Sequence, residues 1–126
     1  MYANVSRVNV AVLDDDPTGT QALSHAQVVC VPSEAAIAAA AATPGTSSLH
    51  VLTNSRALAP AAARSATRAA AAAVAAALPG TRIVLRGDST LRAHLVEEYL
   101  GYVEAVAGGE HRPLVLVPAL PATAST

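Results

Sequence analysis

The sequence predicts an α/β fold, with an open, mostly parallel sheet and helices on both of its faces, in Rossmann-like layers. Five short apolar runs have the length and composition of buried strands, and helical segments separate the later ones. The expected strands are residues 8–13, 27–31, 49–53, 82–86 and 114–117, and the expected helices are residues 34–42, 60–78 and 90–107. Because strands and helices alternate, we expect right-handed crossovers between parallel strands.

The first strand ends in an acidic turn. Residues 10–13 are all apolar, which suits a strand buried on both faces, and residues 14–16 are three aspartates. A proline follows directly, so the acids lie at the carboxyl end of the strand, where open α/β sheets bind ligands. Adjacent acids repel one another, so we expect a cation, an arginine or a reaction partner beside them. A solvated acidic turn is the alternative.

The other elements have recognisable boundaries. Pro60 suits the first turn of a helix, and the segment Leu78-Pro79-Gly80 ends this helix. The alanines of residues 69–77 fit a helix that lies close against the sheet. Cys30, the single cysteine, lies in an apolar run and is expected to be buried in a strand, and His50 is expected to be a half-buried structural residue.

The composition limits the kind of protein. At 126 residues the chain is one domain or part of one, and alanine is the largest part of its 52% hydrophobic residues, with no Phe or Trp. We therefore expect a thin core built by Val, Leu and Ile. A net charge of −1 argues against nucleic acid as a partner. No secretory signal or membrane span is visible in the sequence. We therefore expect a cytoplasmic protein that does not associate with a membrane.

Three predicted loops at strand ends carry clusters of polar residues. They are the acidic turn, the segment Thr53-Asn54-Ser55-Arg56, and the segment Arg86-Gly87-Asp88-Ser89-Thr90-Leu91-Arg92. The ends of parallel strands meet at one edge of a sheet, so these loops should converge. Asp88 or Ser89 can cap the next helix, which places Arg92 in its first turn, against the helix dipole. Arg92 and the free amides would bind an anion there, with added charge from Arg56 and Arg86.

The arginines also have a structural alternative. Arg56 and Arg86 can pair with the aspartates Asp15, Asp16 and Asp88 inside the same crevice, and such pairing is compatible with ligand contact. Both a carboxylate and a phosphate fit an arginine fork. No Cys and His cluster has zinc spacing, and the glycines form neither a Walker loop nor a dinucleotide-binding loop.

One motif resembles the haloacid dehalogenase phosphatases. The spacing Asp14-x-Asp16-x-Thr18 after an apolar strand is similar to their first motif, in which the first aspartate is the nucleophile and magnesium holds the site. Residues 51–54 and 87–88 are similar to parts of two further motifs. That family expects a lysine, and this chain has none. Because such local similarity arises by convergence, a magnesium-dependent phosphatase that uses Asp14 is the alternative hypothesis.

Three motifs resemble the four-carbon acid sugar kinase family more closely. Its Asp-Asp-x-Thr-Gly motif is matched by residues 15–19, and the longer form Leu-Asp-Asp-Asp-Pro-Thr-Gly-Thr-Gln by residues 13–21. Its Thr-Asn-Ser-Arg motif is residues 53–56, and its Asp-Ser-Thr-Leu-Arg motif is residues 88–92. The motifs follow the family's order and span nearly the whole chain. After the last expected strand, residues 118–126 lack the arginine that the family usually carries.

This resemblance implies an ATP-dependent kinase of two domains that acts on sugar acids such as threonate, erythronate or their oxo forms. The amino-terminal domain would bind the small anionic substrate, and a separate carboxyl-terminal domain would bind ATP with Mg²⁺. Arg56, Arg86, Ser89 and Arg92 would hold the substrate, with Asp15, Asn54 and Ser55 as further substrate-binding candidates, and Asp16 or Asp88 would orient or deprotonate the attacking hydroxyl.

We therefore expect the chain to be a truncated amino-terminal sugar-acid-binding domain that is inactive without its nucleotide-binding domain. A non-catalytic remnant of the kinase fold is a further alternative. Nothing in the sequence is a dedicated metal or cofactor site. An incompletely covered, alanine-rich sheet is also compatible with a homo-oligomer.

Overall fold

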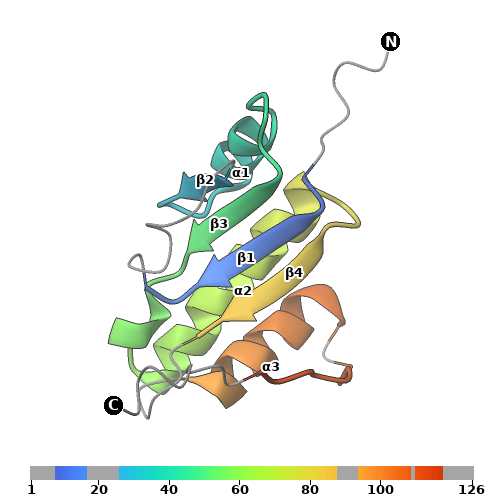
Figure 1. Cartoon of the computed structure of the whole chain (residues 1–126). Helices are drawn as coiled ribbons and strands as arrows, with labels where there is room; N and C mark the ends of the chain where they lie inside the picture. The colour runs from blue at the N-terminus through green and yellow to red at the C-terminus, as the bar shows by residue number, and fades with distance from the viewer. Residues whose placement is uncertain (1–7, 17–25, 88–93, 109, 118–126) are drawn as a thin grey trace, which may run out of the picture.

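The computed structural model describes residues 8–16, 26–87, 94–108 and 110–117 of the chain. They contain a sheet of four parallel strands in the order β2-β3-β1-β4. The strands are β1 (Val10–Asp14), β2 (Ala26–Val29), β3 (Ser48–Leu52) and β4 (Arg82–Arg86) (Figure 1). The parallel sheet and the α/β class are those predicted from the sequence. β1 lies between β3 and β4, so its acidic end has a neighbouring strand end on each side.

The helices of the described residues share one face of the sheet. They are α1 (Glu34–Ala41), the single 3-10 turn η2 (Ser55–Ala57), α2 (Pro60–Ala77) and α3 (Leu95–Val106). Residues of α1, α2 and α3 all pack against one buried core, and in Figure 1 α1 and α2 lie behind the sheet while α3 lies beside α2, beyond β4. The expected helices on the second face are therefore not seen in the described part of the chain.

Small side chains allow the helices to pack closely. Alanine contributes much of the α2 surface that faces the core, as the alanine-rich segment predicted. Gly101 of α3 lies so close to α2 that a Cβ atom there would stand 2.5 Å from the carbonyl oxygen of Arg64. Pro60 begins α2, and Gly80 adopts a φ of 83° just after it ends, both in agreement with the sequence prediction. None of the helices among the described residues is long and apolar enough to cross a membrane.

The segment expected to be the fifth strand is different. Residues 114–117 form no strand, and their side chains are between 47% and 86% exposed. The Tyr99 hydroxyl of α3 accepts a hydrogen bond from the Arg112 amide at 2.8 Å and donates one to the Arg112 carbonyl at 2.5 Å. These bonds tie the chain before this segment to α3 rather than to the edge of β4. An apolar run forms a strand only where it can pair with the edge of another strand, and residues 114–117 do not pair with one.

Two smaller expectations also fail. Cys30 is exposed, because β2 ends at Val29 and lies at the edge of the sheet. The third helix begins at Leu95 with His94 at its amino-terminal cap, later than the expected residue 90. The expected cap residues Asp88 and Ser89, and the expected first-turn residue Arg92, lie outside the described residues.

Candidate functional site

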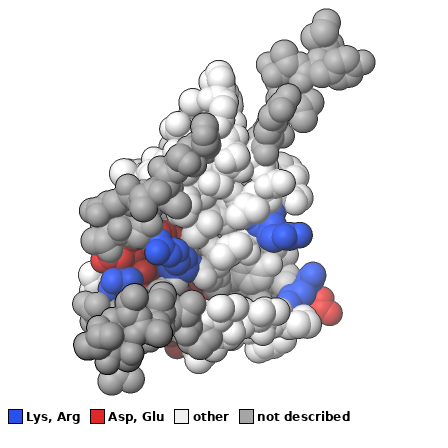
Figure 2. Space-filling view, viewed as in Figure 1, with Lys and Arg blue, Asp and Glu red and all other residues white. Residues whose placement is uncertain are grey.

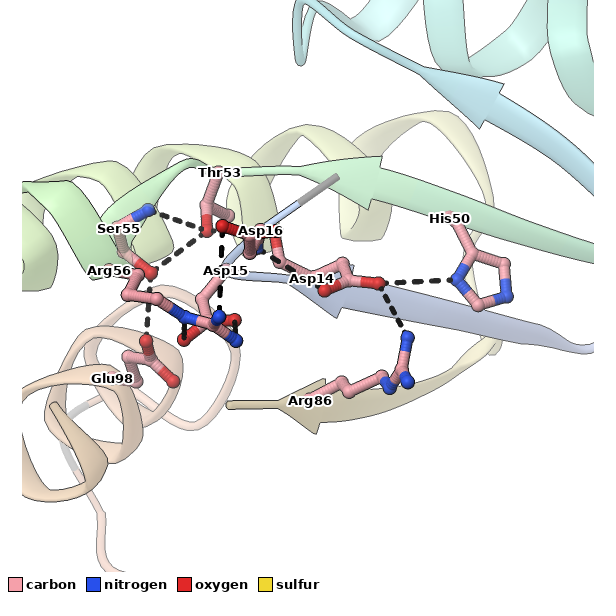
Figure 3. A network of polar contacts seen from close by, with 9 residues as sticks. All are labelled: Asp14, Asp15, Asp16, His50, Thr53, Ser55, Arg56, Arg86 and Glu98. Carbon is pink, nitrogen blue, oxygen red and sulfur yellow. Dashed lines mark hydrogen bonds and ion pairs between the residues drawn. The ribbon is translucent and has the colours of Figure 1, made fainter. Parts of the chain in front are cut away.

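The candidate site lies at the carboxyl ends of the strands, as the sequence predicted. Acidic and arginine side chains gather there on the face shown in Figure 2. They come from the end of β1, the loop after β3, and the last residue of β4 (Figure 3). The register of the strands explains this meeting, because Asp14 is paired with Leu52 on one side and Arg86 on the other.

Asp14 is buried and holds the ends of the strands together. It is 2% exposed, and its Oδ2 atom accepts a hydrogen bond from an Arg86 terminal nitrogen at 3.1 Å. Its carbonyl oxygen accepts a hydrogen bond from the Thr53 amide at 2.9 Å. The Nδ1 atom of His50 lies 3.8 Å from the same Oδ2. Burial lowers the pKa of His50, and the nearby Arg86 charge lowers it further, against the opposing effect of Asp14.

Asp15 and Arg56 form a bidentate ion pair. Nη2 of Arg56 donates to Asp15 Oδ1 at 2.9 Å, and Nε donates to Oδ2 at 3.3 Å. The Asp15 carboxylate is 2% exposed and the Arg56 side chain 23% exposed. The third Arg56 nitrogen, Nη1, lies 3.7 Å from Asp16, whose side chain is 27% exposed. The arginine therefore contacts one buried and one accessible carboxylate at the same edge of the sheet.

A pocket opens beside this pair. It has a volume of about 230 Å³ and is lined by Asp15, Asp16, Asn54, Arg56 and Ala57. Asn54 has a φ of 55°, a left-handed conformation that asparagine tolerates better than most residues. Pockets for drug-sized ligands usually measure about 300–1,000 Å³, so this one is small, and its polar lining says more about a ligand than its size does. Carboxylates and a guanidinium fork around it suit a ligand that carries both hydroxyl groups and a negative charge.

The loop residue Ser55 does not line this pocket. It is fully buried and donates its hydroxyl proton to Oε2 of Glu98 on α3 at 2.7 Å (Figure 3). Burial raises the pKa of Glu98, and the Asp15 charge adds to this effect, whereas the Ser55 hydrogen bond opposes it.

Sequence reasoning did not single out Glu98. It lies on α3 far along the chain from the loop, and only the docking of α3 brings it to Ser55. The helical period could have indicated that Glu98 is buried, because Glu98 and Gly101 are three residues apart and lie on the same inward face of α3.

The other predicted residues fall into two groups. The structure brings Asp15, Asp16, Asn54 and Arg56 together around the pocket, and it places Arg86 near them with a side chain that is 49% exposed. Asp88, Ser89 and Arg92 lie outside the described residues. Among the residues that the structure describes, no group of three or more His, Cys, Asp or Glu side chains is arranged to hold a metal ion.

A comparison with protein families shows which family the chain belongs to. The model of the sugar-binding N-terminal domain matches residues 10–124, which include β1 and every other described element. The chain belongs to this family. Searches among curated proteins and among solved structures found no match.

Membership in the sugar-binding N-terminal domain family confirms the resemblance seen in the motifs. The pocket of this sugar-binding domain lies at the strand ends, where an α/β sheet binds its ligands. Asp14, the nucleophile of the phosphatase hypothesis, is buried and bonded to Arg86. Neither the family nor this burial supports the phosphatase alternative.

Proposed function

We propose that this chain binds a four-carbon sugar acid in the pocket beside Asp15 and Arg56, as the substrate-binding half of an ATP-dependent kinase. The observation that carries the proposal is a pocket of about 230 Å³, in a sugar-binding domain, lined by a guanidinium fork and two carboxylates. Arginine recognises a planar carboxylate through parallel hydrogen bonds, and aspartate oxygens accept hydrogen bonds from sugar hydroxyls. A sugar acid would share the Arg56 guanidinium with Asp15 through its carboxylate and donate a hydroxyl hydrogen bond to Asp16.

Of the two proposed bases, Asp16 and Asp88, Asp16 lies within the described residues and lines the pocket. Its carboxylate lines the pocket and is 27% exposed, whereas Asp15 is engaged by Arg56 on both oxygens. A base must reach the hydroxyl whose proton it accepts, and an accessible carboxylate at the pocket wall can do so. Asp88 remains the second candidate. Phosphoryl transfer depends mainly on such positioning and on charge stabilisation.

In this proposal ATP and Mg²⁺ are held by a second, nucleotide-binding domain of the complete enzyme. The chain's own residues would bind the sugar acid, orient its hydroxyl and accept a proton. Turnover would then require the second domain, and binding of the sugar acid alone would not.

Calorimetric titration with threonate and erythronate tests the proposal, with the neutral four-carbon alcohol erythritol as the ligand control. We expect saturable binding of at least one acid and none of the alcohol. Arg56→Lys keeps the charge but loses the fork, so it should weaken binding by about tenfold. Arg68→Lys is the matched control, because Arg68 lies on α2 with a side chain that is 57% exposed. Absence of binding to every acid would favour a non-catalytic remnant.

A further inference from the structure

Glu98 is a buried carboxyl group that the proposed chemistry does not use. It is 6% exposed, and its Oε2 accepts the Ser55 hydroxyl at 2.7 Å. Gly87, directly after β4, lies close to it, because a Cβ atom there would stand 3.4 Å from Oε1 of Glu98. Residues of η2, of the end of β1 and of the segment after β4 therefore surround this carboxyl group of α3.

Glu98 ends a chain of hydroxyl groups that reaches β1. The Ser55 hydroxyl lies 3.0 Å from that of Thr53, and the Thr53 hydroxyl lies 3.2 Å from the carbonyl oxygen of Asp14. With Glu98 ionised, Ser55 must donate its single proton to Glu98 and can accept one from Thr53. With Glu98 protonated, each donor can point the other way, from Glu98 to Ser55, to Thr53 and to the Asp14 carbonyl. The bonds among Glu98, Ser55 and Thr53 persist in both states with their direction reversed, whereas Thr53 donates to the Asp14 carbonyl only when it does not donate to Ser55.

The loop held by this chain also carries the pocket arginine. Ser55 begins the η2 turn and Arg56 follows it directly. Leu58 closes the turn with a 3.0 Å hydrogen bond from its amide to the Ser55 carbonyl. Ser55 is fully buried, whereas Arg56 reaches the pocket wall. The direction in which Arg56 leaves the backbone is thus set at the residue that Glu98 binds.

We infer that Glu98 is a positioning residue for the pocket, which acts through Ser55 to fix the turn that aims Arg56 at the ligand. α3 supplies no residue to the pocket wall. The helix nevertheless controls the geometry of that wall through one hydrogen bond to a buried hydroxyl. This inference rests on the proposed function insofar as the ligand is a sugar acid.

Because Glu98 can gain or lose its charge, the affinity of the pocket for an anion should depend on pH. The charged groups that face it are Asp15 at the end of β1, Arg56 on η2 and His94 at the start of α3. Burial and Asp15 raise the pKa of Glu98, while Arg56 and His94 oppose the rise. Protonation removes a negative charge close to the pocket arginine. Affinity for an anion should therefore increase as the pH falls through the titration of Glu98.

Three variants separate this role from simple structural support. Glu98→Gln keeps a group that can donate to Ser55 but removes the charge. Ser55→Ala removes the hydrogen bond and keeps Glu98. Glu97→Gln is the matched control, since Glu97 precedes Glu98 on α3, and its side chain is 30% exposed and faces Arg64 at 3.9 Å. Circular dichroism and thermal unfolding establish that each variant is folded.

Two measurements complete the test. Threonate and erythronate affinities are measured by calorimetry at a series of pH values that starts at the ordinary pKa of glutamate and rises from there, because burial raises the pKa of Glu98. The Nε–H resonance of Arg56 is followed by NMR over the same range without ligand. In wild type and Glu97→Gln, affinity should fall as the pH rises and the Arg56 resonance should shift. In Glu98→Gln both profiles should depend on pH less than in wild type, and Ser55→Ala should bind about tenfold more weakly.

The outcomes distinguish the two proposals. If no sugar acid binds wild type, the proposed function fails, and the ligand-free Arg56 resonance still decides the role of Glu98. An Arg56 resonance in Ser55→Ala that matches wild type at every pH would overturn the inference. So would a pH profile in Glu98→Gln identical to that of wild type.

Discussion

Replacing Arg56 with Met would leave the buried Asp15 carboxylate without the guanidinium fork that satisfies both of its oxygens. Breaking a buried ion pair by removing one partner destabilises a protein by about 3–5 kcal/mol, because the remaining charge stays desolvated. Asp15 is 2% exposed, which places it in this class, whereas Arg56 keeps 23% of its side chain in solvent. We therefore expect Arg56→Met to lower the free energy of unfolding by about 3 kcal/mol, the lower end of this range, and to lower Tm by about 10 °C.

Urea unfolding measures this loss, and a double-mutant cycle assigns it to the pair. Asp15→Asn combined with Arg56→Met should recover part of the stability, because no buried charge remains. Arg64→Met is the control, since Arg64 pairs with Glu104 through side chains that are 38% and 31% exposed, and its effect should be much smaller. Equal losses for Arg56→Met and Arg64→Met would refute the reasoning from burial.

Three further results are expected. Gly101→Ala should lower the free energy of unfolding by about 1–3 kcal/mol in a denaturant titration, because its Cβ would stand 2.5 Å from a backbone oxygen of α2. Glu98 has a raised pKa, so its contribution to stability is complete below the unfolded pKa of about 4.3 and is lost as the pH rises through the folded pKa. Urea unfolding at a series of pH values should show wild type losing stability relative to Glu98→Gln as the pH rises, and a difference that does not change with pH would contradict this. Arg86→Gln should raise the pKa of His50 in an NMR titration, because a nearby positive charge is removed.

Sequence reasoning predicted the fold best where a local pattern decides the structure. The apolar run of β1 and the prolines and glycines around α2 are such patterns, and both elements lie within a residue or two of their expected bounds. The failures concern tertiary partners. Residues 114–117 have the pattern of a strand, but they pair with no strand edge in the structure. Glu98 depends on how α3 docks against α2, which no run of neighbouring residues encodes.

The three consecutive aspartates show how adjacent like charges are stabilised at the site. Asp14 is bonded to Arg86 of β4, and Asp15 to Arg56 of η2, so each buried carboxylate has its own arginine from a different part of the chain. Asp16 lies outermost, with a more distant contact of 3.7 Å to Arg56. The sequence prediction offered arginine pairing and ligand contact as compatible roles, and this geometry explains how they combine. An incoming anion meets an Arg56 fork that Asp15 has already oriented, which lowers the entropy lost on binding, but it must share that fork with an aspartate. We therefore expect a rigid site of modest affinity, in which Asp15→Asn increases anion affinity in calorimetry while lowering the stability of the free chain.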